Sequence, residues 1–154
     1  MSIESLITID PNFTQKACHD LESFLYIIIY ICTFTSGPGR VLSKEVHPDT
    51  PLRQWFNNPR RPSATGFMKA GHMLRPDISI FPYFTGYWED IKPFLENLIR
   101  TCFEENPGKP NHLTHDAMVR ILQEALDAVE EPQTTGSKRS HPPGDDRHSK
   151  KGKQ

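Results

Sequence analysis

Cysteine is scarce in this sequence, and its spacing excludes several classes of protein. The chain of 154 residues contains three cysteines, Cys18, Cys32 and Cys102, which lie far apart and form no CxxC pair. An odd number at this spacing predicts neither a disulfide framework nor a zinc knuckle. The N-terminal segment MSIESLITIDPNF also lacks the basic region and the apolar stretch of a secretory signal. We therefore expect reduced core thiols in an intracellular protein of the nucleus or the cytoplasm.

The sequence has no hydrophobic run as long as a membrane span. Its most apolar run, from Phe24 to Phe34, covers 11 residues, whereas a membrane-spanning helix needs about 20. The hydrophobic fraction of 36% is low and the 14 prolines are many, which indicates long loops or an unfolded part. We expect the run to be a buried helix or strand, and we expect no membrane partner.

Motifs for phosphate binding, phosphoryl transfer, metal binding and thiol catalysis are also lacking. Neither GxxxxGK[ST] nor GxGxxG occurs, and the HxDxxxxN and DFG elements of phosphoryl transfer are missing. The segment SGPGR at 36–40 predicts a turn. Cys18 and His19 are adjacent, but neighbours on a helix diverge by about 100° and cannot easily share a proton. His112 and His115 lack a third metal ligand, so we expect capping or surface roles for them. The residues alone predict no catalytic, cofactor or metal site.

Charge divides the chain into two parts. Residues 132–154 contain no large apolar side chain and carry six Lys or Arg against two Asp, a net charge of +4. The formal charge of the whole chain is −1, so residues 1–131 carry about −5. A segment without apolar side chains has nothing to bury. We expect one folded domain over 1–131 and a disordered basic tail over 132–154.

Four helices are expected in the folded domain, which is therefore mainly α. The first runs from Asp20, a good N-cap, to Thr33, and SGPG ends it. Its β-branched IIIYI would also fit a strand, but its length favours a helix. The second covers 63–74, with Ser63 as its cap. Its apolar residues on one face are Phe67, Ala70 and Leu74.

The third and fourth helices show the clearest periodicity. The third covers 87–105, with Pro93 early enough to be tolerated, and the fourth covers 113–131, with Thr114 as its cap. The apolar stripe of the third is Ile91, Leu95, Leu98, Ile99, Cys102 and Phe103. The buried stripe expected for the fourth is Met118, Ile121, Leu122, Ala125, Leu126 and Val129.

Several segments resemble one known family. ACHDLESFLYIIIYICT at 17–33 resembles the signature of the fungal-type protein kinases, in which a segment close to HDLESFFYVLL forms the long central helix of the C-terminal lobe. MSIESLI resembles the FMSIELL that ends the activation segment of that family. The later segments LRQWF, GFMKAGHML, PYFTGYWEDIKPFLENL and HLTHDAMVRILQEALDA resemble its later helices in the same order. The resemblance covers residues 1–131 and implies a partial kinase C-lobe.

The resemblance implies structural roles for two acidic residues. Asp20 corresponds to the aspartate that accepts hydrogen bonds from backbone amides of the catalytic loop, and an N-cap role is the alternative for it. Glu4 corresponds to the glutamate of the APE-type motif, which pairs with an arginine of the late helices; Arg100 and Arg120 are the candidates. The family uses ATP and magnesium, but the residues that bind them have no counterpart here. We expect no phosphotransfer from this chain.

Three interpretations of function remain open at this stage. The chain is a truncated remnant of a kinase, a non-catalytic interaction module that binds proteins through its C-lobe helices, or a nuclear adaptor governed by its tail. No nucleic-acid partner is expected. In the tail, two basic clusters resemble a bipartite import signal that would bind an import carrier, and a merely solvating tail is the alternative. The clusters consist of Lys138 and Arg139, followed by Lys150, Lys151 and Lys153.

Overall fold

The computed structural model describes residues 1–42, 50–56, 62–103 and 113–130. Within these ranges the chain is mostly helical and contains no strand, which confirms the mainly α prediction at that level. His112 and the tail with its two basic clusters lie outside the described residues. The helices are α1 (Ile3–Ile7), α2 (Ala17–Phe34), α3 (Pro51–Phe56), α4 (Pro62–Leu74), α5 (Pro76–Ser79), α6 (Lys92–Phe103) and α7 (His115–Glu130), with the 3₁₀ turns η1 (Phe81–Tyr83) and η2 (Gly86–Ile91).

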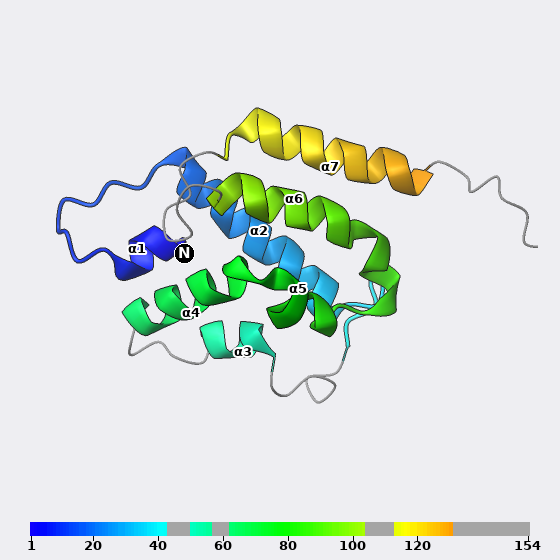
Figure 1. Cartoon of the computed structure of the whole chain (residues 1–154), viewed down its shortest axis with the longest axis horizontal. Coiled ribbons are helices and arrows are strands. Elements are labelled where there is room, and N and C mark those ends of the chain that lie inside the picture. The colour runs from blue at the N-terminus through cyan, green and yellow to red at the C-terminus, as the bar shows by residue number, and fades with distance from the viewer. Residues whose placement is uncertain (43–49, 57–61, 104–112, 131–154) are drawn as a thin grey trace, which may run out of the picture.

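Helix α2 occupies the middle of the arrangement. Figure 1 shows α6 lying across one side of α2, α7 alongside α6, and α4 with α3 on the other side of α6 and α2. The short α1 lies against α4. The core forms where the helices meet, because each contributes its buried apolar side chains there. Its fully buried members include Leu25 and Ile29 of α2, Leu95 and Leu98 of α6, and Ile121 of α7.

A tight turn ends α2, as the SGPG segment predicts. The helix stops at Phe34, and Gly37 and Gly39 have positive φ values of 127° and 70°, which glycine adopts without strain. The turn returns the chain so that Val41 bridges to Thr35. The carbonyl oxygen of Thr35 then accepts hydrogen bonds from Thr85 Oγ1 at 2.7 Å and from the indole of Trp88 at 3.0 Å. The end of α2 is thereby fixed to η2.

The predicted starts of three helices are wrong. The helix expected over 87–105 begins as α6 at Lys92, because the residues before it form the 3₁₀ turn η2. Helix α2 begins at Ala17 with Lys16 as its N-cap residue, so Asp20 lies inside the first turn and does not cap it. The imidazole Nδ1 of His19 accepts the backbone N–H of Lys16 at 2.9 Å, so the capping contact comes from a histidine rather than from the expected acidic side chain. Helix α4 begins at Pro62, a residue that favours the first helical position, so Ser63 is not its cap.

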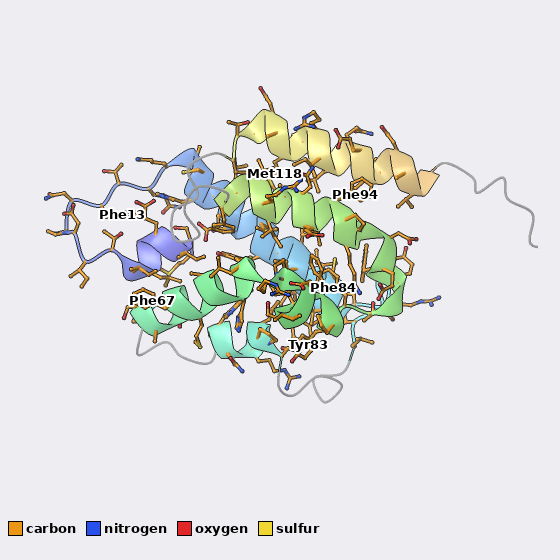
Figure 2. The ribbon with its side chains drawn as sticks, in the orientation of Figure 1. Phe13, Phe67, Tyr83, Phe84, Phe94 and Met118 are labelled. Carbon is orange, nitrogen blue, oxygen red and sulfur yellow. The ribbon has the colours of Figure 1, made fainter. Side chains whose placement is uncertain are left out.

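The apolar face predicted for α4 faces the core only at Ala70, which is half-buried against it. Phe67 is 64% exposed and lies on the outer side of the helix (Figure 2), and Leu74 is exposed too. The buried face instead carries Thr65, Lys69 and Met73. The physical reason is that α4 packs against α1 through this side, where polar contacts described below compensate the buried lysine.

The stripe predicted for α6 is confirmed, and that of α7 holds only in part. Leu95, Leu98, Ile99, Cys102 and Phe103 are buried, Ile91 is half-buried, and Pro93 lies in the first turn of α6. In α7, Thr114 is the cap, since its Oγ1 accepts the N–H of Ala117 at 3.2 Å. Met118, Ile121 and Ala125 of α7 are buried, but Leu126 and Val129 are exposed. Figure 1 shows that the last turns of α7 extend past α6, which leaves them uncovered.

Candidate functional site

The buried carboxylate of α2 belongs to Glu22, not to Asp20. Asp20 is exposed and accepts a hydrogen bond from Gln15 Nε2. The partner of Asp20 among the described residues is thus a glutamine side chain, and its N-cap alternative is wrong because Lys16 occupies that position. Glu22 is completely buried. Its helical spacing to Tyr26 and Ile29 could have identified it, because residues four and seven positions apart share the core face.

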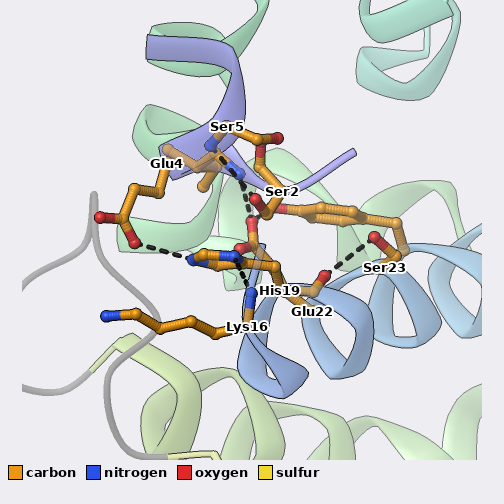
Figure 3. A network of polar contacts seen from close by, with 9 residues as sticks. Ser2, Glu4, Ser5, Lys16, His19, Glu22 and Ser23 are labelled. Carbon is orange, nitrogen blue, oxygen red and sulfur yellow. Dashed lines mark hydrogen bonds and ion pairs between the residues drawn. The ribbon is translucent and has the colours of Figure 1, made fainter. Parts of the chain in front are cut away.

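Glu22 connects the N-terminal segment to α2. One of its carboxylate oxygens, Oε1, accepts the backbone N–H of Ile3 at 2.7 Å and the hydroxyl of Tyr26 (Figure 3). The other, Oε2, is buried and has no hydrogen-bond partner among the described residues. Burial raises the pKa of Glu22, and the donors Tyr26 and Ile3 offset only part of that effect.

Lys69 joins this cluster from α4. Its Nζ lies 3.9 Å from the centroid of the Tyr26 ring and 5.6 Å from that of Trp55, and it donates to the carbonyl oxygen of Met1 at 3.0 Å. Desolvation lowers the pKa of Lys69 to about 8, although the negative charge of Glu22 acts in the opposite direction. Three elements, the N-terminal segment, α2 and α4, thus meet around one buried cation and one buried acid.

Glu4 pairs with a histidine rather than with an arginine. The carboxylate oxygen Oε2 of Glu4 lies 2.9 Å from His19 Nε2 (Figure 3). Because His19 Nδ1 accepts the N–H of Lys16, the neutral ring carries its proton on Nε2 and donates it to Glu4. Arg100 bonds Asn97 and Arg120 bonds Glu124, both at the surface. The expected Glu4–arginine pair is thus replaced by a hydrogen bond between Glu4 and His19, within the first 19 residues.

Close packing completes the attachment of α1 to α4. Gly66 is buried at their contact, and a Cβ atom on it would lie 2.6 Å from Ile7 Cγ1 and 3.1 Å from Leu6 Cβ. The residue is therefore glycine because α1 lies directly on its backbone. The N-terminal segment is held by this contact and by the bonds to Glu22, His19 and Lys69.

The titratable groups of this cluster are engaged in structural contacts. Both ring nitrogens of His19 are used, by Lys16 and by Glu4, so neither is free to take a proton from Cys18. Burial, with the charge of Glu4 as the smaller cause, raises the pKa of the Cys18 thiol, which disfavours the reactive thiolate. His115 is exposed beside Asp116. In the described ranges, no three His, Cys, Asp or Glu residues gather in a way that could hold a metal ion.

The other side of α2 exposes a row of large apolar side chains. Phe24 is 55% exposed, Ile27 53%, Tyr30 46% and Ile31 40%, and the exposed Asp20 lies one turn before Phe24. We call these five residues the open face of α2. A helix that is hydrophobic all round is normally covered all round. Of the helices that the structure describes, α6 covers the opposite side of α2 and none covers the open face.

Two hollows border Ile27 on the open face. One is lined by Asp20, Ser23, Phe24 and Ile27. The other, of about 240 Å³, is lined by Met1, Ser23, Tyr26, Ile27, Tyr30 and Lys69. Both hollows are open to solvent and lie beside the exposed side chain of Ile27.

Among the described helices, α2 also has the length and composition of a membrane span, which the 11-residue apolar run did not predict. Half of its residues are buried inside the fold, as in the core helix of a compact domain. The buried half contains His19, Glu22 and Tyr26, whose polar groups bond to the N-terminal segment. These contacts favour a core helix with one uncovered side.

Comparisons with known proteins do not assign this chain to a family. It matches no family model, no curated protein and no solved structure. A proposal about function therefore depends on the sequence resemblance and on the geometry of α2.

Proposed function

We propose that the chain is the C-terminal part of a kinase-like C-lobe and that it acts as a non-catalytic module that binds another polypeptide through the open face of α2. The proposal takes the family from the resemblance of six segments in the same order along residues 1–131. It takes the binding surface from the four exposed apolar side chains of α2.

The observation that carries this proposal is that α2 is apolar on both sides, while the described helices cover only one of them. Leu25 and Ile29 are fully buried, while Phe24, Ile27, Tyr30 and Ile31 are 40 to 55% exposed on the same helix. A contiguous exposed apolar surface in a folded chain marks an interaction site. Asp20 belongs to the same open face, and the resemblance gives the corresponding aspartate the role of accepting hydrogen bonds from the backbone amides of the catalytic loop.

The module is non-catalytic because phosphoryl transfer needs groups that this sequence does not supply. Nearly all of the catalysis comes from positioning the reactants and stabilising their charge. A nucleotide-binding lysine, a catalytic base and magnesium ligands do this. The sequence has no HxDxxxxN and no DFG element for these roles, since the one HxD, at 47–49, is not followed by Asn at that spacing. With magnesium and labelled ATP, the purified chain should label neither itself nor a generic substrate above a heat-denatured sample.

Site-specific photo-crosslinking tests the binding surface. In cells that express the full chain, Ile27 is replaced by p-benzoylphenylalanine, and a matched variant carries the same residue in place of Gln123 on the exposed side of α7. We expect irradiation to join one defined polypeptide to position 27 and not to position 123. Equal products from both positions, or none from position 27, would contradict the proposal.

A further inference from the structure

We propose that the polypeptide bound by the open face of α2 is a second copy of this chain, with the two α2 helices antiparallel and Asp20 of each copy beside Arg40 of the other. This inference rests on the proposed function, because it names the partner of the same surface. It is carried by the register of the apolar side chains and by the position of the charges at the two ends of α2.

The apolar side chains are arranged so that the face matches itself when reversed. Phe24 and Ile31 lie on either side of Ile27, about 10 Å apart along the helix axis. In an antiparallel pair with its two-fold axis near Ile27, Phe24 of one copy opposes Ile31 of the other, and the reverse contact follows by symmetry. The hollows that border Ile27 give the opposing side chains places to insert.

The charges at the two ends of the face are complementary in the same register. Asp20 is exposed at the beginning of α2. Arg40 is exposed and is held beside the end of α2, because its carbonyl oxygen accepts the N–H of Ser36 at 2.9 Å and its N–H donates to Gly37 at 3.1 Å. Reversing one helix places Asp20 of one copy at the end where Arg40 of the other lies. A parallel pair would instead bring like charges together.

Sedimentation velocity of the full chain tests the pairing. From about 1 µM to about 500 µM we expect a monomer–dimer equilibrium, since a contact built on four exposed apolar side chains per copy is of the weak, small class. Ile27→Asp should raise the dimer dissociation constant at least about tenfold, because it places two carboxylates at the symmetry axis. The matched control Val119→Asp, at an exposed apolar position of α7, should leave it unchanged. Far-UV circular dichroism checks that each variant is folded.

A charge exchange distinguishes this register from other contacts. Asp20→Arg should weaken the dimer, and adding Arg40→Asp to it should restore the dissociation constant to within about threefold of the original value, because the pair is re-formed with its signs reversed. Restoration by the double variant would support the antiparallel register. If the double variant instead weakens the dimer by the sum of the two single effects, the antiparallel register is overturned.

The remaining outcomes separate this inference from the proposed function. A chain that stays monomeric at every concentration, or a dimer that Ile27→Asp does not affect, overturns the second copy as the partner. If position 27 then crosslinks to a different polypeptide, the binding function stands and only the partner changes. If the monomer instead binds phosphatidylcholine–phosphatidylserine vesicles, and Ile27→Asp abolishes that binding, both proposals are overturned in favour of a membrane contact.

Discussion

At the scale of single residues, the carboxylate of Glu22 joins the N-terminal segment to the core. It accepts a backbone N–H and a tyrosine hydroxyl with one oxygen, in a place where water does not reach. A buried carboxylate is stabilising only where donors surround it, and here the second oxygen has no partner among the described residues. The negative charge of Glu22 therefore destabilises the fold, whereas its Oε1 stabilises the fold by accepting the two hydrogen bonds.

These two properties can be separated by substitution. Glu22→Gln keeps an acceptor for Ile3 and Tyr26 and removes the charge, so we expect the free energy of unfolding to change by less than about 1 kcal/mol. Glu22→Ala leaves two buried donors unpaired and should cost about 3 kcal/mol. Asp20→Asn, on the exposed side of the same helix, is the control and should change it by less than about 0.5 kcal/mol. Urea unfolding measures all three, and equal losses for the glutamine and alanine variants would contradict this role.

Lys69 should make stability depend on pH in the alkaline range. Its pKa is about 8 in the folded chain, below the ordinary lysine value of 10.5, so the unfolded chain binds more protons between pH 8 and 10.5. The contribution of Lys69 to the free energy of unfolding therefore rises as the pH rises from 8 to 10.5, and this gain is lost as the pH falls back through 8. Relative to Lys69→Met, the native chain should gain up to about 3 kcal/mol between pH 8 and 10.5. If the difference in free energy of unfolding between the native chain and Lys69→Met stays constant over this pH range, Lys69 is not desolvated.

At the scale of helices, periodicity predicts α6 and most of α7 because their apolar side chains recur over three or more turns. It does not find α1, α3 or α5, which have four to six residues and are too short to show a period. It also places Phe67 and Leu74 of α4 in the core, where only Ala70 packs, and it misses Lys69 and Gly66, which are typical surface residues unless another helix lies against them. The start of α2 was missed because a histidine side chain provides the capping contact.

Two glycines of α4 test the contact between α1 and α4. Gly71→Ala has nothing within 4 Å of the new Cβ and should stabilise the chain by about 0.5 to 1 kcal/mol, through helix propensity. Gly66→Ala brings the same propensity gain but drives a methyl group into Ile7 and Leu6, so it should destabilise the chain by about 1 to 2 kcal/mol. Thermal melts of the two variants should therefore shift in opposite directions. Stabilisation by both would mean that α1 does not lie on Gly66 in solution.

At the scale of the whole molecule, the sequence predicts a helical body and a central apolar helix, but not which side of that helix is uncovered. Phe24, Ile27 and Leu25 are equally apolar in the sequence, and only the packing of the helices in three dimensions buries Leu25 and leaves the other two exposed. The resemblance gives a structural role to Asp20, which lies on the open face, whereas the buried acidic residue of α2 is Glu22. The charge contrast between 1–131 and 132–154 indicates a separate tail, and its import role stays a prediction.

Hydroxyl-radical footprinting of the dilute chain tests the open face of α2 most directly, because α2 contains its own control. Tyr26 and Tyr30 are one turn apart and have the same intrinsic reactivity, but Tyr26 is 5% exposed and Tyr30 is 46% exposed. At concentrations where sedimentation gives a monomer, Tyr30 and Phe24 should be oxidised much faster than Tyr26. Raising the protein concentration should slow the oxidation of Tyr30 and Phe24 but not that of Tyr26. If Tyr30 and Phe24 of the monomer are as protected as Tyr26, the face is covered within the chain and the account is contradicted.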